Sequence, residues 1–273
     1  MNSSAQHRSS PGIVFFALGL VSLIDDGTAN AGLVLAVASE LGLPPTATRA
    51  VILRLRNDGQ VTSQRIGRSA RYTVGSAVAV AQRRWTEHFR EGSPPWDGTF
   101  AGLLYEFPER DRPRRDRLRR AARIAGYGLL RPGLLISPDD RWHQLAQAFG
   151  TDEQAGRILR VGLTLASSNA CSIARDLWEL DRLAERYREI ARTTSRMLAK
   201  PSDRAGEENS SPIARLYQAT QPIYDAVAQD PALPHDLLPA DWPAHQLGAA
   251  LARANAILGP SAVEQLHALK ANL

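Results

Sequence analysis

The stretch TATRAVILRLRNDGQVTSQRIGRSARYTV, residues 46–74, decides the fold of the N-terminal part of this 273-residue chain. Its first half carries apolar side chains four residues apart, at Ala47, Val51 and Leu55. This spacing predicts a helix with one apolar face, because side chains four residues apart stack on the same side of a helix. We expect the helix to end before Gly59, since glycine tolerates the backbone conformations that terminate helices.

The residues on both sides of this helix predict two further helices and a β-hairpin. Helical patterns precede it at Gly12–Ile24 and Ala31–Leu41. Strands are predicted at Val61–Ile66 and Ser69–Val74, joined by Gly67–Arg68, where the glycine suits a tight turn. Three helices followed by a hairpin are the element order of a winged helix-turn-helix.

Positive charge is concentrated in the same stretch. The whole chain has 33 basic and 28 acidic side chains, which gives a net charge of +5. Residues 49–72 alone contain six arginines and one acid. Arg49 and Arg56, seven residues apart, share the helix face opposite the apolar one. Such a helix can pack on a core with one face and enter the major groove of DNA with the other, where arginine pairs with guanine.

The predicted DNA contacts fall on the helix and on the hairpin. Thr46 is expected to cap the helix, with Thr48 and Arg49 in the first turn, where base edges are normally reached. The hairpin supplies long donors suited to phosphates or to the minor groove. The residues predicted to bind DNA are Thr46, Thr48, Arg49, Arg56, Gln64, Arg65, Arg68 and Arg71. The alternative is that these arginines only solvate an exposed surface.

The rest of the chain predicts two more domains and an α+β fold overall. A Gly-Ser-Pro-Pro stretch at residues 92–95 marks a boundary. After it, alternating strands and helices predict a small α/β or α+β domain, and the residues from Ser172 onward are mostly helical. The strands are predicted at Phe100–Phe107, Leu134–Ser137 and Arg157–Leu165, and the helices at Arg112–Gly126 and Asp139–Phe149. The predicted domains are residues 1–92, 95–168 and 170–273.

Several short motifs in a fixed order carry a family resemblance. They are Arg65-Ile66-Gly67-Arg68, Pro95-Trp96-Asp97-Gly98, Gly126-Tyr127-Gly128, Leu177-Trp178-Glu179-Leu180 and Asp230-Pro231-Ala232-Leu233-Pro234. With these motifs the chain resembles the PaaX family of transcriptional regulators over residues 12–269. It departs from the family pattern at Gln60, where the family tends to have an aromatic residue, and at residues 30–33, which lack a tryptophan. Both departures lie around the segment predicted to read DNA.

The resemblance implies a homodimeric repressor that is released from a palindromic operator when an acyl-CoA, typically an aryl-CoA such as phenylacetyl-CoA, binds. It also implies a ferredoxin-like central domain and a C-terminal domain that binds effector or forms the dimer. Guanidinium groups match phosphates, and aromatic rings stack on aryl groups. The candidate effector residues are Arg115, Arg119, Trp178 and Tyr217. The alternative is a solvated arginine-rich helix face and aromatic side chains in the core or dimer interface.

Catalysis is the main alternative of another class. The family's central domain resembles a small CRISPR-adaptation nuclease that binds metal through a carboxylate at the end of its first strand, a position nearest to Glu106 here. This alternative is a metal-dependent nuclease. The histidines are scattered without metal-ligand spacing, and the sequence has no nucleophile motif. We therefore expect a protein that is not an enzyme and that has no metal or cofactor.

The predicted location is the cytoplasm, without membrane attachment. Cys171 is the only cysteine, which excludes an internal disulfide and fits a reducing compartment. The apolar run Gly12–Ile24, followed by Ala29-Asn30-Ala31, has some features of a secretion signal. However, Asp25 and Asp26 directly follow the run, and the run is too short to span a bilayer. We interpret it as the buried first helix of a domain.

Overall fold

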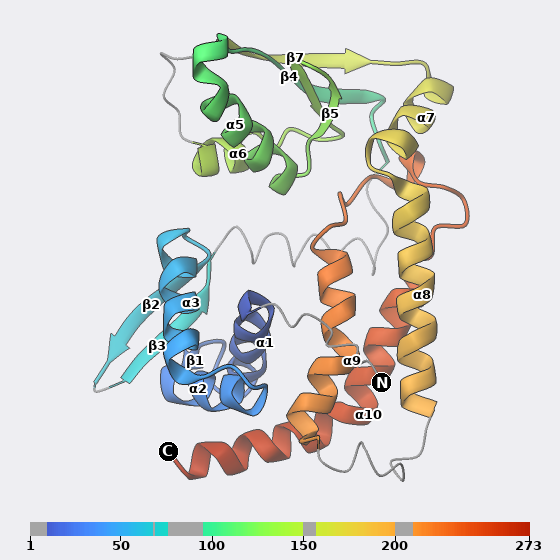
Figure 1. Cartoon of the computed structure of the whole chain (residues 1–273). Helices are drawn as coiled ribbons and strands as arrows, with labels where there is room; N and C mark the ends of the chain where they lie inside the picture. Colours follow the sequence, from blue (N-terminus) through green and yellow to red (C-terminus); the bar gives the residue numbers. More distant parts are fainter. Residues whose placement is uncertain (1–9, 68, 76–94, 150–156, 200–209) are drawn as a thin grey trace, which may run out of the picture. The chain divides into compact units, whose positions relative to one another are not determined.

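The structure, a computed structural model, describes residues 10–67, 69–75, 95–149, 157–199 and 210–273 (Figure 1). Its main elements in chain order are α1 (Ser10–Ser22), β1 (Ala29–Asn30), α2 (Ala31–Glu40), α3 (Pro45–Asn57), β2 (Val61–Ile66), β3 (Ser69–Val74), β4 (Thr99–Glu106), α5 (Arg112–Ile124), β5 (Gly128–Arg131), β6 (Leu134–Ser137), α6 (Trp142–Phe149), β7 (Arg157–Thr164), α7 (Ser167–Leu177), α8 (Leu180–Ala199), α9 (Pro212–Val227) and α10 (Ala244–Ala271). The fold is α+β, as predicted, and the described residues form two antiparallel sheets. None of the helices described is long and apolar enough to cross a membrane.

The chain divides into two compact units. The first consists of Met1–Arg83, Tyr187–Ala228 and His245–Leu273, and the second of Arg84–Arg186 and Gln229–Ala244. The prediction of three consecutive domains does not anticipate this grouping. The C-terminal helices belong to the first unit because α9 and α10 share a hydrophobic core with α1, α2 and α3, although the two groups of helices are far apart in sequence.

The core of the first unit explains why α1 is apolar on most sides. Val14 and Leu18 of α1 are fully buried, and Leu55 of α3 packs in the same core. Tyr217 of α9 and Leu266 of α10 complete this core. Burial of a side chain such as Val14 or Leu18 stabilises the folded state by about 1.5–3 kcal/mol relative to leaving it exposed. The interpretation of the first apolar run as a buried helix is therefore confirmed.

The sheet of the first unit contains the predicted hairpin. Strands β2 and β3 pair antiparallel from Val61 opposite Val74 to Ile66 opposite Ser69, which confirms the predicted strands. The two-residue strand β1 pairs with the outer side of β3 and gives the strand order β1-β3-β2. Sequence periodicity does not predict β1, because two residues are too few to show an alternation.

The second unit has the β-α-β-β-α-β order of ferredoxin-like folds, from β4 to β7. The strand order is β5-β6-β4-β7, with all neighbours antiparallel. Leu103 and Tyr105 of β4 pack against Leu118 of α5 and Leu145 of α6 on one face of the sheet. The three predicted strands and two predicted helices are confirmed within about three residues, whereas β5 was not predicted.

Arg141 joins three segments of the second unit. Its buried guanidinium donates through Nε to Oδ1 of Asp139 at 2.6 Å. Nη1 donates to the carbonyl oxygens of Pro231 at 3.0 Å and Ala125 at 3.3 Å. Gly126 has a φ of +88°, and a Cβ there would lie 1.8 Å from Arg141 Nη1. The close approach and the positive φ both require glycine at this position.

Candidate nucleic-acid interface

The first turn of α3 differs from the sequence prediction. The helix begins at Pro45, and no side chain caps it, so the prediction that Thr46 is the cap is wrong. Proline suits the first helical position, because its φ is already helical and it has no N–H to satisfy. Thr46 lies within the first turn and is exposed, whereas Thr48 is 0% exposed. The Thr48 hydroxyl donates to the carbonyl oxygen of Pro44 at 3.0 Å, so the Thr48 side chain is not part of the exposed surface of the helix.

The outer face of α3 carries arginines that are available for a partner. Val51 and Leu55 are buried, as the apolar stripe predicts, while Arg49, Arg54 and Arg56 are exposed. None of these three arginines forms an ion pair or side-chain hydrogen bond with the residues that the structure describes. The helix therefore presents positive charge on the side opposite its core.

The hairpin residues predicted to bind DNA divide into two groups. Gln64 and Arg65 are exposed, and Arg65 Nε donates to the carbonyl oxygen of Gly67 at 3.4 Å. Arg71 is half-buried, and its Nη1 donates to Oγ1 of Thr28 at 2.9 Å, so it holds β3 against the residues before β1. Arg68 lies outside the described residues. The exposed donors of the hairpin are thus near its turn.

An ion pair that the sequence did not indicate supports this sheet. Asp25, whose side chain is 4% exposed, accepts from Nζ of Lys270 at 2.6 Å and from the backbone amide of Asn30 at 3.3 Å. Burial alone raises the pKa of the Asp25 carboxyl, but the hydrogen bond and charge of Lys270, the amide of Asn30 and the charge of Arg71 hold this pKa below its ordinary value. The end of α10 is thereby tied to the residues that lead into β1. No local pattern reveals a partner 245 positions away.

Three of the four candidate effector residues lie in the second unit, and each has a partner there. Arg115 forms an ion pair with Glu109 at 3.2 Å. Arg119 Nε donates to the hydroxyl of Tyr105 at 2.8 Å. The Trp178 ring stacks on Phe100, with centroids 6.4 Å apart. These contacts give all three side chains a structural role.

Tyr217, the fourth candidate, belongs to the first unit. It is buried in the core, and its ring meets the ring of Phe16 edge to face at 5.1 Å. This position matches the alternative in which the aromatic side chains serve the core. The structure therefore does not gather the four predicted residues around one pocket within a unit.

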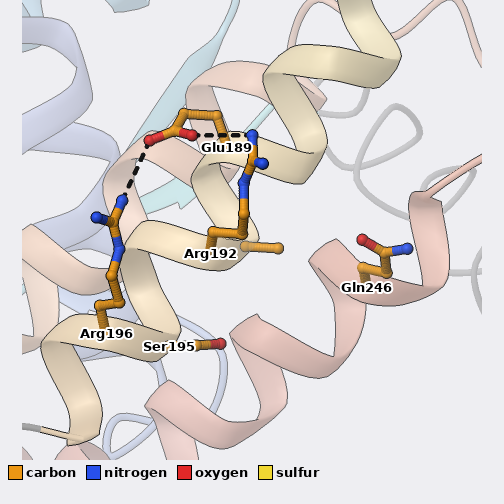
Figure 2. Close-up of a pocket in the computed structure, with 6 residues that line it drawn as sticks. Glu189, Arg192, Ser195, Arg196 and Gln246 are labelled. Carbon is orange, nitrogen blue, oxygen red and sulfur yellow. Dashed lines mark hydrogen bonds and ion pairs between the residues drawn. The ribbon is translucent and has the colours of Figure 1, made fainter.

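An open pocket of about 690 Å³ lies between α8 and α10 in the first unit (Figure 2). Its lining residues are Glu189, Ala191, Arg192, Ser195, Arg196 and Gln246. The Glu189 carboxylate accepts from Arg192 at 3.0 Å and from Arg196 at 3.3 Å, so two guanidinium groups share one anion. Ser195 and Gln246 add neutral polar groups from the two helices (Figure 2). This combination suits a small anionic ligand.

The residue considered for catalysis is Glu106. Glu106 is exposed at the end of β4, opposite Arg157 of β7. Among the residues that the structure describes, no group of three or more His, Cys, Asp or Glu side chains is placed to hold a metal ion. The described residues therefore add no support to the hypothesis of a metal-dependent nuclease.

Comparison with known proteins places the second unit and the C-terminal helices in one family. Residues 93–161 match the model of the PaaX protein central Cas2-like domain, and residues 178–268 match that of the PaaX-like protein C-terminal domain. The chain is also 26% identical over 222 residues to the transcriptional repressor PaaX of Escherichia coli (strain K12), an alignment that covers 78% of this chain and 69% of the relative.

A solved structure shares the fold. It is the uncharacterized protein Rv0674 from Mycobacterium tuberculosis, with a TM-score of 0.53 and 21% sequence identity. The match covers 95% of this chain and 99% of the other. The two family matches together span more than half of the chain and lie in the expected order. The chain therefore belongs to the PaaX family.

Proposed function

We propose that this protein is a transcriptional repressor that binds double-stranded DNA through an N-terminal winged helix-turn-helix. In this proposal α3 is the recognition helix and the β2–β3 hairpin is the wing. The observation that carries it is the outer face of α3, where Arg49, Arg54 and Arg56 are exposed and have no ion pair among the described residues. A cationic helix of this kind supplies both phosphate neutralisation and guanine recognition.

Family membership supports this proposal, because the Escherichia coli relative is a transcriptional repressor. We further propose that the protein acts as a homodimer on a palindromic operator. A two-fold dimer presents two recognition helices about one DNA turn apart, so the half-sites of the operator mirror the symmetry of the protein.

Selection of bound duplexes from a random pool tests the proposal. We expect the full chain to enrich an inverted repeat whose half-sites are about 10 base pairs apart, centre to centre, or a multiple of that spacing. Footprinting of the enriched duplex then shows protection in the major groove at both half-sites. A pool that remains random after repeated selection at physiological ionic strength contradicts the proposal, because a repressor must prefer its operator to bulk DNA.

We also propose that an acyl-CoA effector releases the operator and that its phosphates bind in the α8–α10 pocket. Support comes from the two guanidinium groups there, which both pair with the Glu189 carboxylate and can exchange it for phosphate oxygens. Release would follow from a shift of the protein toward a dimer geometry that no longer matches the operator spacing.

Replacement of Arg192 and Arg196 by alanine tests the pocket. We expect the phenylacetyl-CoA concentration needed for half-maximal release of operator DNA to rise about tenfold or more, since each lost charge-assisted hydrogen bond costs about 1.5–3 kcal/mol. Operator affinity without effector should not change. The measurement is a fluorescence anisotropy titration of labelled operator.

Two control variants test whether the effect is specific to the α8–α10 pocket. R182A removes an exposed arginine of the same helix that pairs with Glu179 and should leave the release curve unchanged. R115A/R119A tests the residues first considered for effector binding. If R115A/R119A weakens the response and R192A/R196A does not, the effector phosphates bind at α5 and the pocket assignment is wrong.

A further inference from the structure

A large apolar side chain lies at the centre of the cationic face of α3. Leu53 is 56% exposed, although Val51 and Leu55, two positions away on either side, are buried. Two positions along a helix correspond to a rotation of about 200°, so Leu53 points away from the core. Arg49, four residues earlier, and Arg56, three residues later, lie on the same face.

Single exposed leucines are ordinary on protein surfaces and need no function. Leu53 differs from Leu23, which is 72% exposed, because of what surrounds it. The flanking Arg49 and Arg56 lie roughly 6 Å and 4.5 Å away along the helix axis. A polyanion that neutralises these two arginines must therefore also cover the leucine. The charge of the face thus selects nucleic acid as the occupant.

We propose that Leu53 contacts the C5-methyl group of a thymine in the operator and contributes to its sequence specificity. This inference rests on the proposed function of α3 as the recognition helix. The thymine methyl is the apolar group among the base edges of the major groove, where the other groups are hydrogen-bond donors and acceptors. A leucine that contacts the thymine methyl is removed from water at no polar cost. Against a donor or acceptor of another base, the leucine would leave that polar group without a hydrogen-bond partner.

Deoxyuridine provides a test, because it pairs as thymine does and lacks only the methyl group. In the duplex selected by the wild-type chain, each thymine of a half-site is replaced singly by deoxyuridine, and dissociation constants are measured by anisotropy. We expect one replacement to weaken wild-type binding about fourfold, the value for burial of one methyl group. The variant L53A should bind the thymine and deoxyuridine duplexes equally well.

Two further variants separate the contact from general effects. L53M keeps an apolar side chain of similar length and should retain the preference for thymine. L104A removes a leucine of β4 that is 42% exposed and should behave as the wild type does. Because Leu53 is on the surface, L53A is expected to fold normally, and its circular dichroism spectrum should match that of the wild type.

The outcomes distinguish this inference from the proposed function. If the wild type binds the selected duplex but is insensitive to every deoxyuridine replacement, the thymine contact is wrong and the DNA-binding function stands. The thymine contact is also wrong, and the DNA-binding function again stands, if replacement of thymine by deoxyuridine weakens binding of L53A as much as it weakens binding of the wild type. If no duplex is selected at all, both the function and the contact are overturned.

Discussion

Replacement of Arg49 by alanine is expected to weaken binding to the selected operator by about 1–3 kcal/mol, or roughly fivefold to 150-fold, and to relax the base preference at one position of each half-site. The reason is that Arg49 is exposed in the first half of α3 and has no ion pair among the described residues, so its guanidinium is available for two hydrogen bonds to a guanine. Affinities for the operator and for all single-base variants of one half-site measure both effects.

Arg65 in the hairpin provides the comparison for Arg49. R65A should weaken all duplexes to a similar degree, because in the proposed binding mode an arginine near the hairpin turn contacts phosphates, which are the same in every sequence. It should also reduce the slope of log affinity against log salt by about one unit. If R65A changes base preference while R49A lowers all affinities alike, the roles of helix and hairpin are reversed from those proposed.

Replacement of Arg141 by methionine is expected to destabilise the second unit by about 2–4 kcal/mol. The buried guanidinium holds the carbonyl oxygens of Ala125 and Pro231, and methionine offers no donor to either. Asp139, which loses its charged partner, is 49% exposed, so water compensates part of that loss. Most of the penalty therefore comes from the two carbonyl oxygens that lose their donor, of which the one of Pro231 is buried.

The neighbouring ion pair is a matched control for this effect. Arg160 pairs with Asp140, but both side chains are exposed, so R160M should cost less than about 1 kcal/mol. Hydrogen exchange of the backbone amides of β4 in urea measures the stability of the second unit within the full chain, where a single two-state transition is not assured. Equal loss of protection in R141M and R160M would contradict the role assigned to the buried guanidinium.

The sequence by itself determined the elements whose signal is local. The apolar side chains four residues apart in α3 marked its buried face, and two strand candidates joined by the turn glycine Gly67 marked the hairpin with its boundaries. It also determined that Arg49 and Arg56 face away from the core. These predictions succeed because periodicity depends on residues within a few positions of one another, and each element shows its own pattern.

Only the tertiary structure decided which side chains of these elements are available to a partner. Thr48 lies in the turn expected to reach DNA, yet its hydroxyl bonds to the backbone of Pro44. Arg71 is committed to Thr28, and Asp25 to Lys270 at the far end of the chain. Exposure and pairing depend on which distant segments fold together, here α9 and α10 onto the first three helices, and no local period carries that information.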